Sequence, residues 1–289
     1  MSIPKDMFKS GIEYWQHPIF IIGFSILFHF QVLGSDNSDS TRLFFSYILD
    51  EEMYYETRIF REKEDDTIVN LIVLLDGDEY MGIASDFIDL YNFDQRFDNT
   101  CILALHSTTQ SRFSHYTPSQ QDWTNNDDKE QIALYSTTGR FPLFSEFLSK
   151  EIIPFLEERF NIHFRNKSIF GHSMGGLCVL SFLVYSPELF DNYISISPSV
   201  VWDDYVLLRE METLASNKQH IYNFKSFHLG IAEKDIAHYI SDVKYVKKFI
   251  EKDKSSGADF NYFKLKDETH MTSGVQGLIR YLNMKVSAH

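Results

Sequence analysis

The residues whose types and spacing most clearly indicate a chemical function lie in the stretch Gly171-His172-Ser173-Met174-Gly175. This G-x-S-x-G pattern is typical of a sharp strand-to-helix turn that exposes a serine at its apex. Both glycines are expected where a Cβ atom would clash with the crowded turn. Free N–H groups at the start of a helix favour developing negative charge. The pattern predicts Ser173 as a nucleophile and the Met174 N–H as an oxyanion donor, although a bystander serine in a glycine-rich turn is the plainer alternative.

A serine hydroxyl becomes a good nucleophile when a base takes its proton. The candidate base is His270, in the polar stretch Asp267-Glu268-Thr269-His270 between an expected strand and the closing helix. The alternative interpretation is an ordinary surface histidine. His172, beside the serine, is expected to be a packing or pocket-wall residue, since neighbouring side chains diverge at such a turn.

A third residue should orient the imidazole and stabilise its charged form. Glu233 and Asp235 follow an expected strand over residues 227–232, and Asp235 is the first choice, with Glu233 as the alternative. Either carboxylate could instead be solvated or cap a helix. The chain order of serine, acid and histidine is that of α/β-hydrolases, and it differs from the chymotrypsin and subtilisin orders.

A second oxyanion donor is expected after the apolar strand over residues 68–75, at Asp76-Gly77-Asp78. Gly77 would let the backbone turn its N–H groups inward, and the Asp78 N–H is the predicted donor. No acidic, cysteine or histidine cluster has metal-ligand spacing, so the sequence predicts neither a metal nor a cofactor.

From about residue 41, expected β-strands alternate with expected α-helices along the chain, and these elements must position the candidate residues. Such alternation predicts an α/β fold with a mostly parallel central sheet and helices on both faces. Expected strands cover residues 42–49, 54–60, 68–75, 100–105, 167–170, 192–197, 227–232 and 260–266. Expected helices cover residues 81–91, 141–160, 174–185, 202–216, 236–251 and 273–284, with Pro154 kinking the second or beginning a separate short helix.

The polar stretch over residues 107–140 is expected to be a long loop. It could roof a pocket with Phe113, Tyr116 and Trp123 as an aromatic wall. Alternatively, it is a surface loop that a few aromatic side chains anchor.

The chain divides into an N-terminal apolar segment, residues 1–38, and a hydrolase domain, residues 39–289. The apolar run over residues 18–33 ends at small and polar residues, as in a signal peptide or an uncleaved anchor. A buried N-terminal element and an artefactual extension are the alternatives. A cleaved segment would place the protein outside the cytoplasm, as a secreted or periplasmic protein, and otherwise a cytoplasmic location is expected.

The composition excludes several function classes. The 289 residues carry a formal net charge of −14, which argues against binding to nucleic acid or to an anionic membrane surface. Membrane association is expected only if the N-terminal segment is an uncleaved anchor. Cys101 and Cys178 are expected to be small buried hydrophobes, with a disulfide as the alternative in an oxidising compartment.

Four stretches together resemble the esterase D-like, or enterochelin esterase-like, family of α/β-hydrolases. They are Val73-Leu74-Leu75-Asp76-Gly77; Arg112 through Thr117-Pro118; Gly139-Arg140-Phe141 with Phe147-Leu148 and Glu151-Ile152-Ile153-Pro154; and Gly171-His172-Ser173-Met174-Gly175-Gly176. The resemblance extends from about residue 41 to the C-terminus. Members of the family include siderophore esterases, S-formylglutathione hydrolases, feruloyl esterases and mycolyltransferases.

The resemblance implies Ser173 as nucleophile, His270 as base and Asp235 as acid. Ala232 stands where the family's acid-bearing turn carries glycine. His115 and Tyr116 differ from the residues usual in siderophore esterases, so the sequence leaves the ester open.

The sequence thus predicts a serine hydrolase that cleaves a small-molecule carboxylic ester through an acyl-enzyme. Acyl transfer to an alcohol or thiol by the same residues is one alternative. A non-catalytic binding protein on a hydrolase scaffold is the other, because a fold does not by itself fix a function. The oligomeric state is not predicted.

Overall fold

The computed structural model describes residues 41–61, 63, 67–91, 97, 99–121, 128–217, 224–252 and 259–287. The predicted N-terminal segment, residues 1–38, lies outside these ranges. The strands are β1 (Arg42–Ser46), β2 (Glu51–Phe60), β3 (Ile68–Leu75), β4 (Thr100–Leu105), β5 (His163–His172), β6 (Asn192–Ile196), β7 (Ser226–Lys234) and β8 (Asp259–Thr269). The helices are α1 (Gly77–Tyr91), α2 (Thr109–His115), α3 (Lys129–Tyr135), α4 (Phe141–Phe147), α5 (Ile153–Phe160), α6 (Met174–Tyr185), α7 (Trp202–Ser216), α8 (Ala237–Lys252) and α9 (His270–Ser287).

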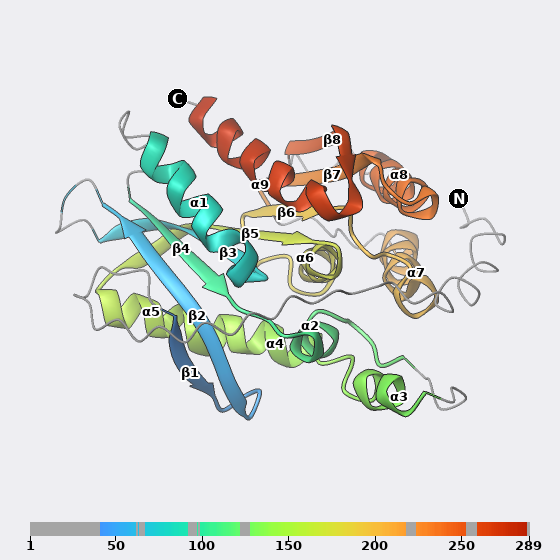
Figure 1. The fold of residues 1–289 in the computed structure, drawn as a ribbon, viewed down its shortest axis with the longest axis horizontal. Helices are drawn as coiled ribbons and strands as arrows, with labels where there is room; N and C mark the ends of the chain where they lie inside the picture. Colours follow the sequence, from blue (N-terminus) through green and yellow to red (C-terminus); the bar gives the residue numbers. More distant parts are fainter. Residues whose placement is uncertain are drawn as a thin grey trace.

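The described strands form one eight-stranded sheet in the order β1-β2-β4-β3-β5-β6-β7-β8 (Figure 1). The β1–β2 and β2–β4 pairs are antiparallel, and every later pair is parallel. The predicted α/β class and mostly parallel sheet are therefore confirmed. The carboxyl ends of parallel strands meet at one edge of a sheet, which is where ligands bind in open α/β folds.

Two apolar layers enclose the sheet because side chains alternate across each strand. In β3, Val69, Leu71 and Val73 face one layer, while Ile72 and Leu74 face the other. The first layer is covered by α4, α5, α6, α7 and α8, and the second by α1 and α9. Helices thus lie on both faces, as predicted.

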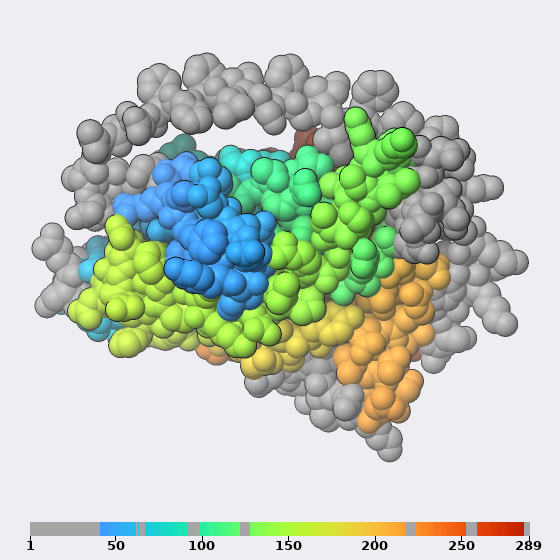
Figure 2. All heavy atoms as spheres, turned by 90° about the horizontal axis from the view of Figure 1, so that it is seen from below, coloured from blue at the N-terminus to red at the C-terminus, as the bar shows by residue number. Residues whose placement is uncertain are grey.

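The β1–β2 hairpin lies against the α4–α5 segment, and Figure 2 shows the two side by side in blue and yellow-green. Ser46 donates its hydroxyl to Glu151, and the Phe44 ring packs edge-on against Phe155. The predicted single helix over residues 141–160 is broken by a π-helical turn, Leu148–Ile152. Pro154 lies in the first turn of α5, directly after this π-helical turn, so α5 is the separate short helix that was one of the two predicted outcomes for Pro154.

The predicted loop over residues 107–140 was wrong in part, because it contains α2 and α3. Both helices are short, with little apolar periodicity, but each begins at a capping residue. Thr108 and Ser111 form a reciprocal capping box at α2, and Asp128 caps α3 through two backbone N–H groups. Helix α1 begins four residues earlier than predicted, because its first turn holds Asp78 and Glu79 rather than apolar residues.

Candidate active site

Ser173 lies between the end of β5 and the start of α6, with φ of 57° and ψ of −113°. A non-glycine residue in this region is strained by about 1–3 kcal/mol and persists only where its surroundings hold it. Here the Ser173 N–H donates to the Ile196 carbonyl at 3.0 Å, and the Ser173 carbonyl accepts from the Leu177 N–H at 3.0 Å. The backbone of the turn is therefore fixed, and it places the Cβ of Ser173 at the apex.

The glycines around this turn are required by close backbone approach. A Cβ atom on Gly171 would lie 2.2 Å from the Gly175 carbonyl oxygen, which confirms the predicted clash. At Gly175 the nearest atom would be a carboxylate oxygen of Asp76 at 3.3 Å, a milder contact than predicted. Gly176 is the tighter position, at 2.9 Å from the Ile196 carbonyl oxygen.

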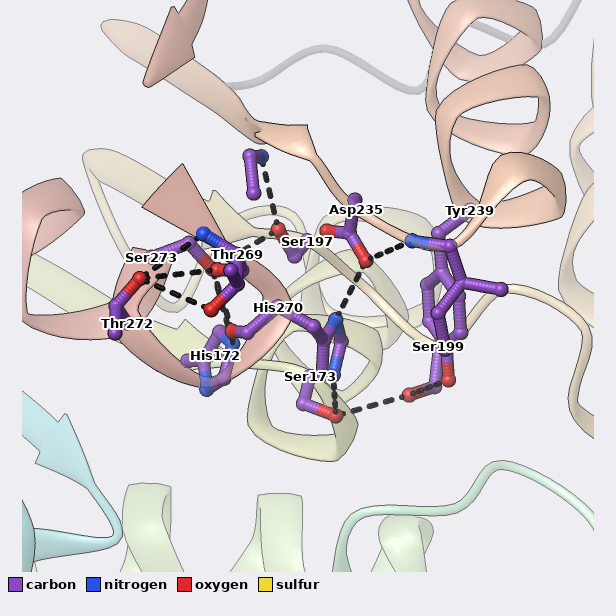
Figure 3. Close-up of polar contacts among 12 residues, drawn as sticks. His172, Ser173, Ser197, Ser199, Asp235, Tyr239, Thr269, His270, Thr272 and Ser273 are labelled. Carbon is purple, nitrogen blue, oxygen red and sulfur yellow. Dashed lines mark hydrogen bonds and ion pairs between the residues drawn. The ribbon is translucent and has the colours of Figure 1, made fainter. Parts of the chain in front are cut away.

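Ser173, His270 and Asp235 come together at the carboxyl edge of the sheet (Figure 3). His270 Nε2 lies 3.0 Å from Ser173 Oγ, and His270 Nδ1 lies 3.0 Å from Asp235 Oδ1. The Asp235 side chain is fully buried, and the His270 side chain is 18% exposed. His270 is the first residue of α9 rather than part of a loop, because β8 continues to Thr269. This arrangement can carry a proton from the hydroxyl to the imidazole.

The two candidate acids have different surroundings. Burial raises the pKa of the Asp235 carboxyl, but the neighbouring His270, the nearby Ser197 hydroxyl and the hydrogen bond from the Ile236 N–H together outweigh it, and the net pKa is lowered. Asp235 is therefore ionised and can accept a hydrogen bond from the Nδ1–H group of His270. Glu233 is exposed and accepts the Asp267 N–H at 3.0 Å instead.

His172 is buried and ties the nucleophile turn to the first turn of α9. Its Nε2 lies 2.8 Å from the His270 carbonyl oxygen, so Nε2 carries the proton and donates it. Burial, reinforced by the neighbouring His270, lowers the pKa of His172 to about 3. His172 thus stays neutral and packs as predicted. A Cβ on Gly274 would lie 3.0 Å from the His172 ring, so the glycine permits this packing.

Two residues that the sequence did not indicate, Ser199 and Tyr239, lie against Ser173 and His270. Ser199 Oγ lies 3.3 Å from Ser173 Oγ, and the Tyr239 hydroxyl lies 3.1 Å from Ser199 Oγ. The Tyr239 ring also packs against the His270 ring, with centroids 4.8 Å apart. Ser199 lies in the segment that follows β6, and Tyr239 lies in α8. No local sequence pattern predicts that these two residues approach each other.

The turn after β3 is held by a buried ion pair. Asp76 has φ of 54°, and its carboxylate forms an ion pair with Arg112 Nε at 2.9 Å and accepts a hydrogen bond from the Ser107 hydroxyl. The left-handed residue is thus Asp76 rather than Gly77, which corrects the reason proposed for the glycine. Gly77 is needed because a Cβ there would lie 2.6 Å from the Ala104 backbone.

The N–H groups of Met174 and Asp78 remain predicted oxyanion donors. Met174 is the first residue of α6, and Asp78 lies in the first turn of α1, so both N–H groups belong to helix N-termini. Helix N–H groups at these positions have no partner within the helix, which leaves them available to an anionic oxygen.

The predicted aromatic pocket wall is not supported. Phe113 and Tyr116 are buried in the core, and the Phe113 ring packs edge-on against Tyr135 and Trp202. The Tyr116 hydroxyl accepts the Asp76 N–H at 3.2 Å. The alternative of anchoring aromatics therefore fits these two residues. Trp123 lies outside the described residues.

Three further findings concern the described part of the chain. It contains no group of three or more His, Cys, Asp or Glu side chains that could hold a metal ion. No helix within it has the length and apolar character needed to cross a membrane. Cys101 and Cys178 are both buried free thiols, so they form no disulfide with each other.

Comparison with protein families places this site in a known context. A family model described as "Putative esterase" matches residues 59–228, which is more than half of the chain. The chain is 36% identical over 73 residues to the ferri-bacillibactin esterase BesA of Bacillus subtilis, a match that covers 25% of each protein. It is 32% identical over 82 residues to the siderophore triacetylfusarinine C esterase of Aspergillus fumigatus, covering 28% of each. The matched stretches thus span about a quarter of the length of these relatives.

Solved structures match over a greater length. The BES protein from Bacillus cereus superposes with a TM-score of 0.74 at 19% identity, covering 90% of this chain and 99% of that chain. The siderophore hydrolase EstA from Aspergillus nidulans superposes with a TM-score of 0.70 at 16% identity, covering 92% and 100%. At these identities the likeness concerns the fold, and it confirms the predicted α/β-hydrolase fold.

Proposed function

The chain belongs to the esterase family whose model matches residues 59–228, and from that premise we propose that it is a serine hydrolase cleaving carboxylic esters through an acyl-enzyme. The observation that carries the proposal is the continuous contact from Ser173 Oγ to His270 Nε2 and from His270 Nδ1 to Asp235, with both distances at 3.0 Å. This geometry is the one that activates a serine hydroxyl in unrelated hydrolase folds.

In the acylation step, Ser173 Oγ attacks the ester carbonyl carbon while His270 Nε2 takes the hydroxyl proton. The carbonyl oxygen becomes an oxyanion, which the N–H groups of Met174 and Asp78 would stabilise. Buried Asp235 holds the imidazole tautomer and stabilises its positive charge. The tetrahedral intermediate then collapses: the bond from the carbonyl carbon to the leaving oxygen breaks, and the imidazolium protonates that oxygen. The alcohol departs, and the acyl group remains on Ser173.

In the deacylation step, His270 takes a proton from a water molecule, which attacks the acyl carbon. A second oxyanion forms in the same place and collapses, releasing the carboxylic acid and returning the proton to Ser173 Oγ. The imidazole returns to its starting state, so the cycle needs no further residue to reset it.

The proposed substrate class is an ester of the siderophore type. The curated relatives are described as siderophore esterases, and solved neighbours include siderophore hydrolases. Hydrolysis of such a molecule at its ester bonds would use the same two steps repeatedly.

The test is hydrolysis of a short p-nitrophenyl ester series and of a ferric tri-ester siderophore by wild type and by Ser173→Ala. We expect turnover by wild type and a loss of about 10⁴-fold or more in kcat for the variant. A fluorophosphonate probe should label wild type and leave Ser173→Ala unlabelled. A folded wild-type chain that neither reacts with the probe nor cleaves any ester would refute the proposal.

A further inference from the structure

The nucleophile has a second hydrogen-bond partner besides the base. Ser199 Oγ lies 3.3 Å from Ser173 Oγ, and Ser199 Oγ also lies 3.1 Å from the Tyr239 hydroxyl (Figure 3). Ser199 is 3% exposed and Tyr239 is 7% exposed, so water has little access to either hydroxyl. The Ser199 backbone is fixed as well, because its N–H donates to the Ser173 carbonyl at 3.1 Å.

An ionised Asp235 and a neutral His270, the form in which His270 can act as a base, together fix the direction of each hydrogen bond between Asp235 and Tyr239. An ionised carboxylate only accepts, so His270 Nδ1 must donate to it. Neutral His270 then accepts at Nε2, and the Ser173 hydroxyl is the donor. The single Ser173 proton is used in this bond.

The remaining two contacts follow from the same count of protons. Because Ser173 has no second proton, the hydroxyl of Ser199 must donate to Ser173 Oγ. Ser199 then has no proton left, so the Tyr239 hydroxyl must donate to Ser199. Burial, together with the negative charges of Asp235 and Asp242, raises the pKa of Tyr239 above its ordinary value, so its hydroxyl keeps its proton.

We infer that Ser199 is a further catalytic residue of the proposed esterase and that Tyr239 positions it, in a directed chain from Tyr239 through Ser199 and Ser173 to His270. The inference rests on the proposed function, because it concerns how Ser173 attacks. Ser199 occupies the lone-pair side of Ser173 Oγ, so the hydroxyl proton of Ser173 is held on the side of His270. Without this donor the Ser173 side chain could rotate away from the base.

The proton and electron count of the attack is unchanged by the added residues. The Ser173 proton moves to His270 Nε2 as the bond from Oγ to the carbonyl carbon forms and the carbonyl π electrons move to the oxygen. The Ser199 hydroxyl keeps its own proton and donates to Oγ as negative charge builds there before the new bond is complete. The Tyr239 hydroxyl also keeps its proton and donates a hydrogen bond to Ser199 Oγ throughout the attack.

The experiment measures kcat, KM and the rate of Ser173 phosphonylation by a small fluorophosphonate in wild type, Ser199→Ala, Ser199→Cys, Tyr239→Phe and the Ser199→Ala/Tyr239→Phe double variant. Loss of one hydrogen bond to the reacting oxygen should lower kcat and the phosphonylation rate about tenfold in Ser199→Ala, with KM changed less than twofold. Ser199→Cys, which keeps a weak donor, should fall between wild type and Ser199→Ala. Tyr239→Phe should lose about threefold, and the double variant should match Ser199→Ala because Tyr239 acts through Ser199.

Ser181→Ala is the matched control, because Ser181 is also a buried serine, with its hydroxyl donating to the Leu177 carbonyl inside α6. It should react at the wild-type rate. If Ser199→Ala reacts as fast as wild type, or if the two single losses multiply in the double variant, the directed chain is refuted while the esterase proposal stands. If wild type itself is inert towards esters and probe, both proposals fall together.

Discussion

At the scale of single residues, the neighbouring carboxylates of Asp235 and Glu233 differ in burial and in their hydrogen-bond partners. The Asp235 carboxylate is fully buried and lies 3.0 Å from His270 Nδ1. Glu233 points to a different partner, the Asp267 N–H, near the sheet edge. The difference arises at the end of β7, where the register with β8 shifts between Ala232 and Lys234. Two positions along the chain thus separate a surface acid, Glu233, from the candidate triad acid, Asp235.

Replacement of these two carboxylates by their amides should give opposite results. Asp235→Asn keeps the shape but removes the charge that selects the His270 tautomer, so kcat should fall by about 10³–10⁴-fold. Glu233→Gln should retain more than half of the wild-type kcat. Steady-state kinetics on one p-nitrophenyl ester measures both. A large loss in Glu233→Gln with an active Asp235→Asn would assign the acid role to Glu233.

At the scale of elements, the β5–α6 turn depends on backbone contact between its two glycines. The strand and the helix pack so closely that the Gly171 Cα faces the Gly175 carbonyl, and neither backbone can shift without moving Ser173. The same sequence contains a glycine without such contact. Gly82 is exposed within α1, and a Cβ there would meet nothing within 4 Å.

The two glycines should therefore respond differently to alanine. Gly171→Ala places its Cβ 2.2 Å from a carbonyl oxygen, so we expect a loss of about 1–3 kcal/mol in unfolding free energy and loss of esterase activity. Gly82→Ala should instead raise the unfolding free energy by about 0.5–1 kcal/mol and keep full activity, since alanine is the better helix former. Urea denaturation and ester hydrolysis measure the two effects. A fully active and stable Gly171→Ala variant would contradict the strained turn.

At the scale of the whole molecule, buried ionisable groups make stability depend on pH in two directions. Burial lowers the pKa of His228 from 6.5, the ordinary value for histidine, to about 4. The neutral, buried imidazole therefore contributes fully to stability above pH 6.5, and this contribution is lost as the pH falls from 6.5 through 4. Burial raises the pKa of Asp242 to about 7. Among the residues that the structure describes, neither Asp242 carboxylate oxygen has a hydrogen-bond partner. Its contribution is complete below about pH 4 and is lost as the pH rises through 7.

Asp242→Asn should remove the alkaline part of this dependence. An amide has the shape of the protonated carboxyl but never ionises, so the variant should match wild type at about pH 4, where Asp242 still makes its full contribution. At pH 8 its unfolding free energy should exceed that of wild type by roughly 2–4 kcal/mol. Urea denaturation at both pH values gives the difference, in which the histidine contributions cancel. Asp86→Asn, an exposed aspartate in α1, is the control and should show no pH-dependent difference.

The sequence by itself determined the features that local chemistry and periodicity encode. Continuous apolar runs predicted β3 and β4 to the residue, because strands buried on both faces need apolar side chains throughout. The G-x-S-x-G pattern predicted the start of α6 and the place of Ser173, because the steric demands of the turn are local. Chain order and strand ends indicated Asp235 and His270, whose catalytic roles stay predictions.

Tertiary structure decided the features that depend on approach between distant segments. The contacts of Ser199 with Ser173 and Tyr239 join the segments that follow β5 and β6 to α8. The bond from His172 to the His270 carbonyl joins residues 98 positions apart. The burial of Phe113 and Tyr116 follows from their packing against other elements. A hydrogen bond or a ring contact of this kind depends on a distance in space, and residue type and spacing along the chain do not specify that distance.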